Sequence, residues 1–285
     1  MIELIYKNDQ ERTIFFGGAN ATWKLVTVEG LGLAPKTFST AVYPGIPGAE
    51  LTGESIGART ITLTADLRQN NETQLRLSQA AITLDRPGEL ILRVGYKSRK
   101  IGARCNALDI GDRNGAVQRC VFQFTCDYPY FEDTETTYIP VFARTPLLNK
   151  YFTFDGMFSK RVSRGEILSI GNIFTEPVFY IDVQHVPEES TTAEKGILIT
   201  NYTTGQYIRL DYEPAQGEQI TIDIPNRDIH NDAGENLIAY ISDDTFLDGF
   251  YIMPGANDIE ALNYSADTSM TVMCMFTNKY VEAVY

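Results

Sequence analysis

The sequence predicts a mainly β fold, with a β-rich N-terminal domain that contains one α-helix and a C-terminal β-sandwich. Short runs of alternating apolar and polar residues recur along the chain, turn residues separate them, and a single segment has clear helical spacing. A chain of 285 residues, of which 44% are hydrophobic, is long enough for two domains that each bury a core. The fold class therefore rests on periodicity and length together.

The expected strands are runs rich in β-branched and aromatic residues, bounded by turn residues such as Pro87-Gly88 and Asn114-Gly115. They cover residues 59–67, 88–96, 118–126, 177–183, 218–224, 237–242, 249–255 and 269–280. Their close spacing in both halves is typical of all-β domains.

Residues 199–212, ITNYTTGQYIRLDY, predict a hairpin. In its second strand Ile208 and Leu210 should face a core, while Tyr207 and Arg209 should face outward. Gly205 supplies the positive φ that the turn needs. One face of this hairpin must therefore be covered by other parts of the protein.

The one expected helix runs from about Asn71 to Leu84. Asn70 or Asn71 can cap its first turn, and Pro87 prevents it from continuing. Leu77, Ala81 and Leu84 recur at helical spacing, which predicts that this face of the helix packs on a sheet of the first domain.

The boundary between the domains is expected near residues 140–160, because residues 131–156 carry a negative run and two prolines and lack clear alternation. We therefore predict an N-terminal domain over residues 1–145 and a C-terminal domain over residues 146–285. The first of these fragments is expected to assemble without the second.

The formal net charge of −13 is concentrated in the second half of the chain. Residues 1–150 hold 17 basic and 16 acidic side chains, whereas residues 151–285 hold 7 and 21. Affinity for nucleic acid comes from clustered Lys and Arg, so this distribution argues against a DNA-reading role. This charge distribution suits a protein surface along which DNA slides without specific binding.

Signals of enzymatic chemistry are weak, and we expect no catalytic, metal-binding or cofactor-binding residue. The two histidines, His185 and His230, have no partner signature, and the chain has no Walker loop, GxSxG elbow or HExxH pair. The four cysteines show no metal-ligand spacing and are expected to be buried thiols. No signal peptide and no run of about 20 apolar residues is seen, so membrane insertion is not expected.

One basic cluster stands out in the first half, formed by Arg93, Lys97, Arg99, Lys100 and Arg104. It is either a solvated hairpin or a surface that docks on the acidic part of a neighbouring subunit. We take these five residues as the candidate subunit interface.

An ordered series of segments resembles the distal tail protein (Dit) family of phages with long, non-contractile tails. The series consists of YPGIPGAELTGESIGARTITLTADL (43–67), CVFQFTCDYPYFED (120–133), GNIFTEPVFYIDV (171–183), ITNYTTGQYIRLD (199–211), ITIDIPNRDIHNDAGENLI (220–238) and IMPGANDIEAL (252–262). The order and spacing of these segments match those of the family along nearly the whole chain.

This resemblance implies a structural protein of the virion, not an enzyme. Its N-terminal domain would close into a homo-hexameric ring at the tail tip, and its C-terminal domain would be a galectin-like β-sandwich. The ring would be the baseplate hub, assembled in the host bacterial cytoplasm. Its partners would be the tail tube protein, the tail-associated fibre or lysin protein and, in some phages, receptor-binding proteins, with DNA passing through the channel.

Two other classes of function remain open from the sequence. A carbohydrate-binding, lectin-like module would need exposed aromatic residues with Arg, Asn and Glu on one face of the sandwich. A glycan hydrolase would need two carboxylates roughly 5 to 10 Å apart in a cleft. The fold alone does not establish either of these functions, because function depends on the residues of a site.

Overall fold

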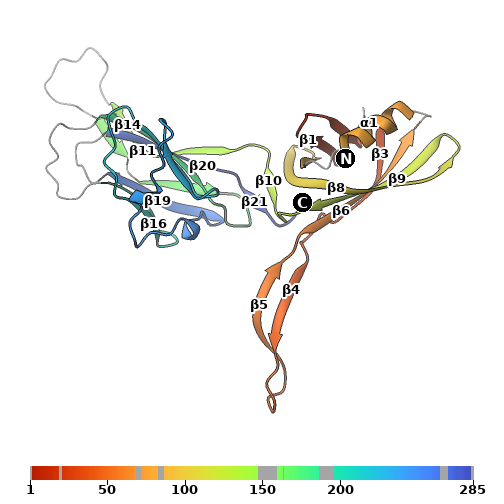
Figure 1. The fold of residues 1–285 in the computed structure, drawn as a ribbon, viewed down its shortest axis with the longest axis horizontal. Coiled ribbons are helices and arrows are strands. Elements are labelled where there is room, and N and C mark those ends of the chain that lie inside the picture. Colours follow the sequence, from red (N-terminus) through yellow and green to blue (C-terminus); the bar gives the residue numbers. More distant parts are fainter. Residues whose placement is uncertain are drawn as a thin grey trace. The chain divides into compact units, whose positions relative to one another are not determined.

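The chain forms two compact units in a computed structural model that describes residues 2–18, 21–68, 72–82, 87–146, 159–162, 164–185, 196–263 and 269–283 (Figure 1). Unit 1 contains Met1–Thr134 and Lys279–Tyr285, and unit 2 contains Glu135–Asn278. The chain thus leaves unit 1 once and returns to it with its last residues. The boundary expected at residue 145 falls inside a strand of unit 2, because Pro140 and Pro146 obscure its alternation.

Unit 1 is built mainly from strands. Its elements are β1 (Ile2–Asn8), β2 (Thr13–Phe16), β3 (Trp23–Glu29), β4 (Lys36–Ala41), β5 (Glu50–Ile56), β6 (Arg59–Arg68), α1 (Glu72–Ile82), β7 (Gly88–Val94), β8 (Lys97–Asn114), β9 (Val117–Cys126), β10 (Phe131–Asp133) and β21 (Lys279–Tyr280).

The main sheet of unit 1 closes into a barrel because the long strand β8 pairs with β7 through its first half and with β9 through its second. Around the barrel the order is β8-β7-β1-β2-β3-β6-β9, and β10 and β21 extend the sheet beside β8. Tyr6, Phe16, Trp23, Phe122 and Phe124 are buried in its core and contact one another through their rings. Full closure leaves few free strand edges in this part of the unit.

The helix lies where the sequence predicts it, but its buried face is different. Ser78, Ala81 and Ile82 are buried, whereas Leu77 is 57% exposed. The Trp23 Nε1–H donates to Ser78 Oγ at 3.0 Å, and this bond sets which side of the helix faces the barrel. The expectation for Leu77 was therefore wrong, because a buried indole N–H needs a partner. The expected cap and Leu84 lie outside the described residues.

Unit 2 contains two sheets and two short 3₁₀ turns. Its elements are β11 (Thr137–Pro146), β12 (Ser159–Val162), β13 (Arg164–Ser169), β14 (Val178–His185), β15 (Ile197–Asn201), β16 (Gln206–Leu210), β17 (Gln219–Asp223), β18 (Asp228–Asn231), η1 (Ile238–Tyr240), η2 (Leu247–Gly249), β19 (Gly255–Asn263) and β20 (Ser269–Phe276).

The two sheets of unit 2 pack face to face as a sandwich. The orders are β12-β11-β20-β14-β17-β18 and β13-β19-β15-β16, and one apolar core contains residues of both. The predicted hairpin is confirmed as β15 and β16, with Ile208 and Leu210 buried and Gly205 at φ 73°. The mainly β fold is thereby confirmed.

Two expected strands are absent as regular strands. Residues 237–242 contain the turn η1, and residues 249–255 form one isolated bridge, Thr175 to Ile252, before β19 begins. Leu237, Phe250 and Ile252 are nonetheless fully buried. A short apolar run can fill a core without pairing as a strand, and its sequence pattern is then the same as that of a buried strand. The sequence therefore predicted strands in both places.

Candidate assembly surface

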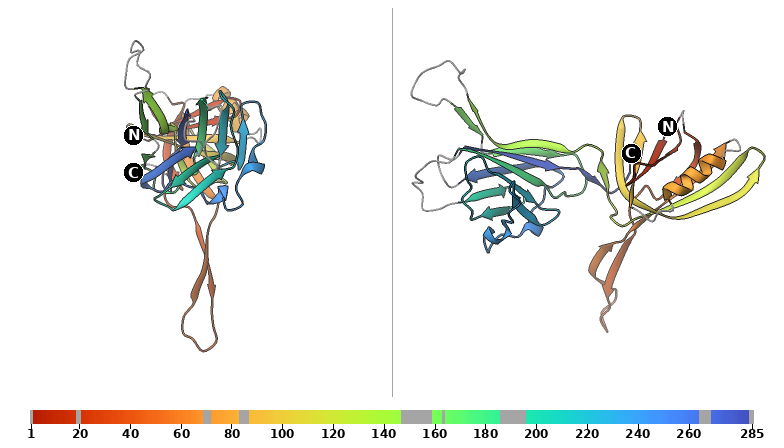
Figure 2. Two further views of the ribbon diagram at one scale, coloured as in Figure 1. Left: turned by 90° about the vertical axis from the view of Figure 1, so that its left-hand side faces the viewer. Right: turned by 45° about the horizontal axis from the view of Figure 1, so that its top comes forward.

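The strands β4 and β5 form a two-stranded arm that leaves the barrel between β3 and β6 (Figures 1 and 2). Lys36 lies opposite Ile56 at its base, and Ala41 lies opposite Glu50 near its tip. Among the described strands, β4 and β5 pair only with each other. A two-stranded hairpin without a covering layer is at best marginally stable in water.

One face of the arm carries large exposed apolar side chains together with the Lys36–Glu54 ion pair. The alternation of β4 and its register with β5 place Phe38 and Leu51 on the same side, and they are 56% and 58% exposed. Val42, Tyr43 and Ile46 lie between the two strands, toward the tip, and are also exposed. The other face carries small or polar residues such as Thr37 and Ser39. We call Phe38, Val42, Tyr43, Ile46 and Leu51 the apolar stripe of the arm.

The base of the arm is held firmly. The guanidinium of Arg59, whose side chain is almost fully buried, donates to the carbonyl oxygens of Gly30 and Gly32 at 3.1 and 2.7 Å. Gly30 has φ 86°, and a Cβ there would collide with the carbonyl oxygen of Thr60. Burial lowers the pKa of Arg59. Its charge is compensated by carbonyl dipoles, which fixes the chain at the point where the arm begins.

The C-terminal segment completes this base. Arg59 also donates to the Val281 carbonyl at 2.6 Å, and the Ala283 N–H donates to the Leu31 carbonyl at 2.9 Å. Arg99 lies over the ring of Tyr280 at 3.4 Å and donates to the Glu282 carbonyl at 2.8 Å. The arm therefore depends on residues from the far end of the chain.

The five residues of the predicted basic cluster all lie on β7 and β8, but they do not share one face. Arg99 points inward and is 9% exposed, opposite Leu92 of β7. Lys100 pairs with Glu89 at 3.3 Å, and Arg104 pairs with Asp127. Arg93 and Lys97 are exposed near the β7–β8 turn. The interface role of the cluster stays a prediction, now limited to Arg93, Lys97, Lys100 and Arg104, which are more exposed than Arg99.

The arm was missed at the level of sequence. Residues 36–41 contain one large apolar residue, Phe38, and β5 carries a register shift near Thr52, so neither strand alternates clearly. The signal that could have found it is the tip sequence YPGIPG, whose Gly45 has φ 84°. Exposed apolar residues on both sides of such a turn indicate a hairpin that a partner covers.

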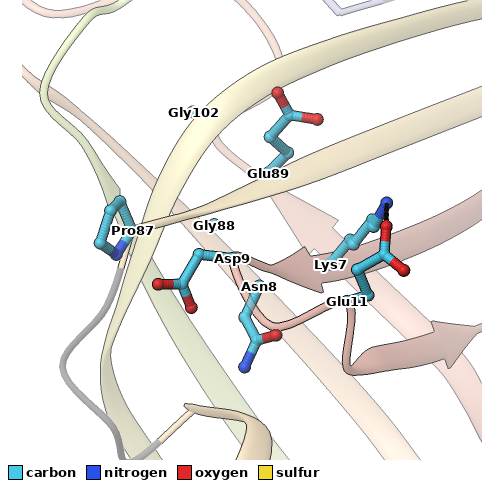
Figure 3. A pocket seen from close by; sticks show the side chains of 8 residues that line it. All are labelled: Lys7, Asn8, Asp9, Glu11, Pro87, Gly88, Glu89 and Gly102. Atoms are coloured by element: carbon cyan, nitrogen blue, oxygen red, sulfur yellow. Dashed lines mark hydrogen bonds and ion pairs between the residues drawn. The ribbon is translucent and has the colours of Figure 1, made fainter.

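An open depression lies at the β1–β2 turn, and four of its eight lining residues are charged (Figure 3). It is lined by Lys7, Asn8, Asp9, Glu11, Pro87, Gly88, Glu89 and Gly102. Lys7 pairs with Glu11 at 3.1 Å inside it. Ligand sites are usually enclosed and lined mostly by apolar side chains with a few polar groups, whereas this depression is open and none of its lining residues has a large apolar side chain.

Other candidate chemistry is sparse in the described part of the chain. His230 Nδ1 lies 2.8 Å from Asp228 Oδ2, and the side chain of His185 lies outside the described residues. No group of three or more His, Cys, Asp or Glu among the residues described could hold a metal ion, and no described helix is long and apolar enough to cross a membrane. The four cysteines are free, and burial raises the pKa of Cys105 and Cys120 to about 11. Raised pKa values make thiols poor nucleophiles.

Comparison with known families gives a match in the second half of the chain. Residues 170–280 match the SPP1 Dit family, described as Siphovirus-type tail component, C-terminal domain. No curated protein matches the sequence. The matched range covers most of unit 2 and the return to unit 1.

Comparison with solved structures covers almost the whole chain. The crystal structure of the SPP1 Dit (gp 19.1) protein, described as a paradigm of the hub adsorption apparatus in phages that infect Gram-positive bacteria, aligns over 98% of this chain and 99% of its own. The TM-score is 0.70 at 14% identity. The phage P2 baseplate in its activated conformation with Ca aligns over 98% of both chains, with a TM-score of 0.49 and 12% identity.

The resemblance that the sequence indicated is confirmed by the family match and by the likeness to the SPP1 Dit structure. The chain matches the siphovirus-type tail component family over residues 170–280 and has the fold of the SPP1 Dit protein along nearly its whole length.

Proposed function

We propose that this protein is a structural component of a phage tail tip, where copies of the chain close into a hexameric ring that forms the baseplate hub. The proposal is supported by the family match of residues 170–280 and by the fold shared with SPP1 Dit. In this role the protein is part of the virion and is not an enzyme. It is assembled in the cytoplasm of the host bacterium.

The observation that carries the ring is the arm with its apolar stripe. Exposed apolar surface of this kind is stabilised when another molecule covers it. A head-to-tail contact in which the arm of each copy lies on the next copy uses two different surfaces, and such a contact closes into a ring when its rotation fits. The fixed base at Arg59 would hold the arm in the direction that this closure needs.

Unit 1 supplies the ring in this proposal, and unit 2 supplies further docking surfaces. One face of the ring joins the tail tube protein, and the other joins the tail-associated fibre or lysin protein. Receptor-binding proteins attach further out, and DNA passes through the channel without specific binding. The candidates for contact with an acidic neighbour are the four more exposed members of the basic cluster, Arg93, Lys97, Lys100 and Arg104.

The ring-forming part must include the C-terminal segment. A fragment that ends at residue 145 lacks the Val281 and Glu282 carbonyls that accept from Arg59 and Arg99. It also lacks β21, which pairs with β10. We therefore expect unit 1 to assemble alone only when residues 279–285 are supplied.

The test is the mass of the full chain in solution by light scattering over a range of concentrations, followed by negative-stain imaging. We expect rings of six times the 31.9 kDa chain mass. The double variant Phe38→Ser, Leu51→Ser should weaken assembly at least tenfold, because it makes the stripe polar. The control, Thr37→Ala with Ser55→Ala, changes a cross-strand pair on the opposite face and should assemble normally.

A wild-type protein that stays monomeric at every concentration would contradict the ring. Rings that form equally well in the Phe38→Ser, Leu51→Ser variant would contradict the role of the arm. Both variants should keep the melting temperature of the monomer, since all four side chains lie on an exposed ribbon.

A further inference from the structure

The outward face of the four-stranded sheet of unit 2 carries an ordered row of polar and aromatic side chains. The registers place Arg164 of β13 opposite Glu260 of β19, Glu260 opposite Thr200 of β15, and Thr200 opposite Tyr207 of β16. Neighbouring strands are about 4.8 Å apart, so this row spans about 14 Å. Alternation puts all four side chains on the face opposite to the buried Ile199 and its neighbours in the core.

Two tyrosine rings on this face are held in fixed orientations. The Tyr202 hydroxyl donates to Glu260 Oε2 at 2.7 Å, and the Tyr207 hydroxyl donates to Asp244 Oδ2 at 2.8 Å. Tyr202 is nevertheless 49% exposed and Tyr207 is 36% exposed. A rigid, partly exposed ring loses little conformational entropy when a ligand packs on it.

The charged groups around the rings are also held in fixed positions by contacts with one another. Arg164 forms a two-pronged contact with Asp258 and lies over the ring of Tyr202, 4.4 Å from its centroid. The Arg164 guanidinium holds the pKa of Asp258 below its usual value. Arg209 binds Asp211 Oδ1 at 2.7 Å at the other end of the row. Donors and acceptors therefore alternate beside the aromatic rings in a preformed pattern.

The charge of this face limits what it can bind. Carboxylates outnumber guanidinium groups, since Arg164 and Arg209 stand among the acidic residues Glu166, Asp211, Asp244, Asp258 and Glu260. Polymers rich in phosphate or carboxylate would be repelled. A neutral molecule with many hydroxyl groups and apolar C–H faces can donate to the carboxylates, accept from the guanidinium groups and pack on the tyrosine rings.

We propose that Arg164, Tyr202, Tyr207 and Glu260, on the outward face of this sheet, form a binding site for a neutral saccharide. The site lies wholly within unit 2 and does not depend on the ring. It would let unit 2 contact a sugar polymer directly, in addition to any protein that it carries.

The test uses the full chain and an array of neutral oligosaccharides of hexoses, N-acetylhexosamines and deoxyhexoses, with a glycerol phosphate polymer as the anionic probe. We expect saturable binding to at least one neutral oligosaccharide and none to the anionic polymer. Tyr202→Ala and Arg164→Gln should each weaken binding at least tenfold. Tyr202→Phe should weaken it less, because the ring remains and only the hydrogen bond to Glu260 is lost.

The control variant is Tyr180→Ala, which removes a tyrosine of similar exposure, 42%, from β14 in the other sheet. It should bind as the wild type does, and all variants should keep the wild-type melting temperature. The proposal is overturned if no neutral oligosaccharide binds, if the anionic polymer or a basic peptide binds instead, or if Tyr202→Ala binds no more weakly than Tyr180→Ala.

Discussion

Two hairpins of the molecule, β15–β16 and the β4–β5 arm, have opposite surroundings. In the β15–β16 hairpin, Ile199 and Ile208 are at most 1% exposed because the second sheet of the sandwich covers them. In the β4–β5 arm, Phe38 and Leu51 are more than half exposed. Both hairpins carry apolar residues on one face. The difference shows that one hairpin is completed within the chain, whereas the other is left for a partner to complete.

The largest expected effect comes from truncating an apolar residue in each hairpin. Ile199→Ala should lower the free energy of unfolding by about 2–5 kcal/mol, because it opens a cavity in a core that cannot fully collapse. Phe38→Ala should change that of the monomer by less than about 0.5 kcal/mol, because its ring is exposed. Urea unfolding at a concentration that keeps the protein monomeric measures both. Equal losses would mean that the arm is covered within the chain.

The second effect concerns the base of the arm. Arg59→Met should lower the free energy of unfolding by about 2–3 kcal/mol, because the carbonyls of Gly30, Gly32 and Val281 lose a charged donor. It should also speed protease cleavage within the arm. Arg113→Met is the control, since Arg113 is exposed and donates to the nearby Gly115 carbonyl. If both variants lose the same stability, the hydrogen bonds of Arg59 do not hold the base of the arm.

The third effect is a pH dependence, which is absent at neutral pH and acts on the base of the arm. Burial raises the pKa of Cys126 and of Tyr280 to about 12, from ordinary values of 9.0 and 10.0. Both groups stay protonated to a higher pH in the folded protein than in the unfolded chain. Their contribution to stability is therefore complete below pH 9 and is lost as the pH rises to 12. Each group adds up to about 1.4 kcal/mol per pH unit to the slope.

Melting temperatures between pH 8 and 11 measure this decline. In Cys126→Ala the decline should be shallower than in the wild type, because one titrating group is gone. A stability of unit 1 that is constant from pH 8 to 11 would show that these groups are not buried in solution.

Sequence pattern was sufficient where local periodicity and core packing agree. The alternation of residues 206–210 and the turn at Gly205 predicted the β15–β16 hairpin, and helical spacing placed α1. The pattern failed at residues 237–242 and 249–255, where apolar residues are buried without a ladder. The five residues of the basic cluster lie close together in sequence, but the strand register places Lys97 and Arg99 on one face and Arg93 and Lys100 on the other.

The sequence by itself determined the mainly β fold, the two-part organisation, the concentration of acidic residues in the second half and the resemblance to phage tail proteins. Only the tertiary structure decided that the chain returns to unit 1, that Arg59 binds a carbonyl 222 residues away, and that the apolar stripe of the arm is uncovered. The physical reason is that periodicity reports how each residue sits in its own strand. Which segments meet, and which apolar faces remain without a cover, depends on contacts between residues far apart in the chain.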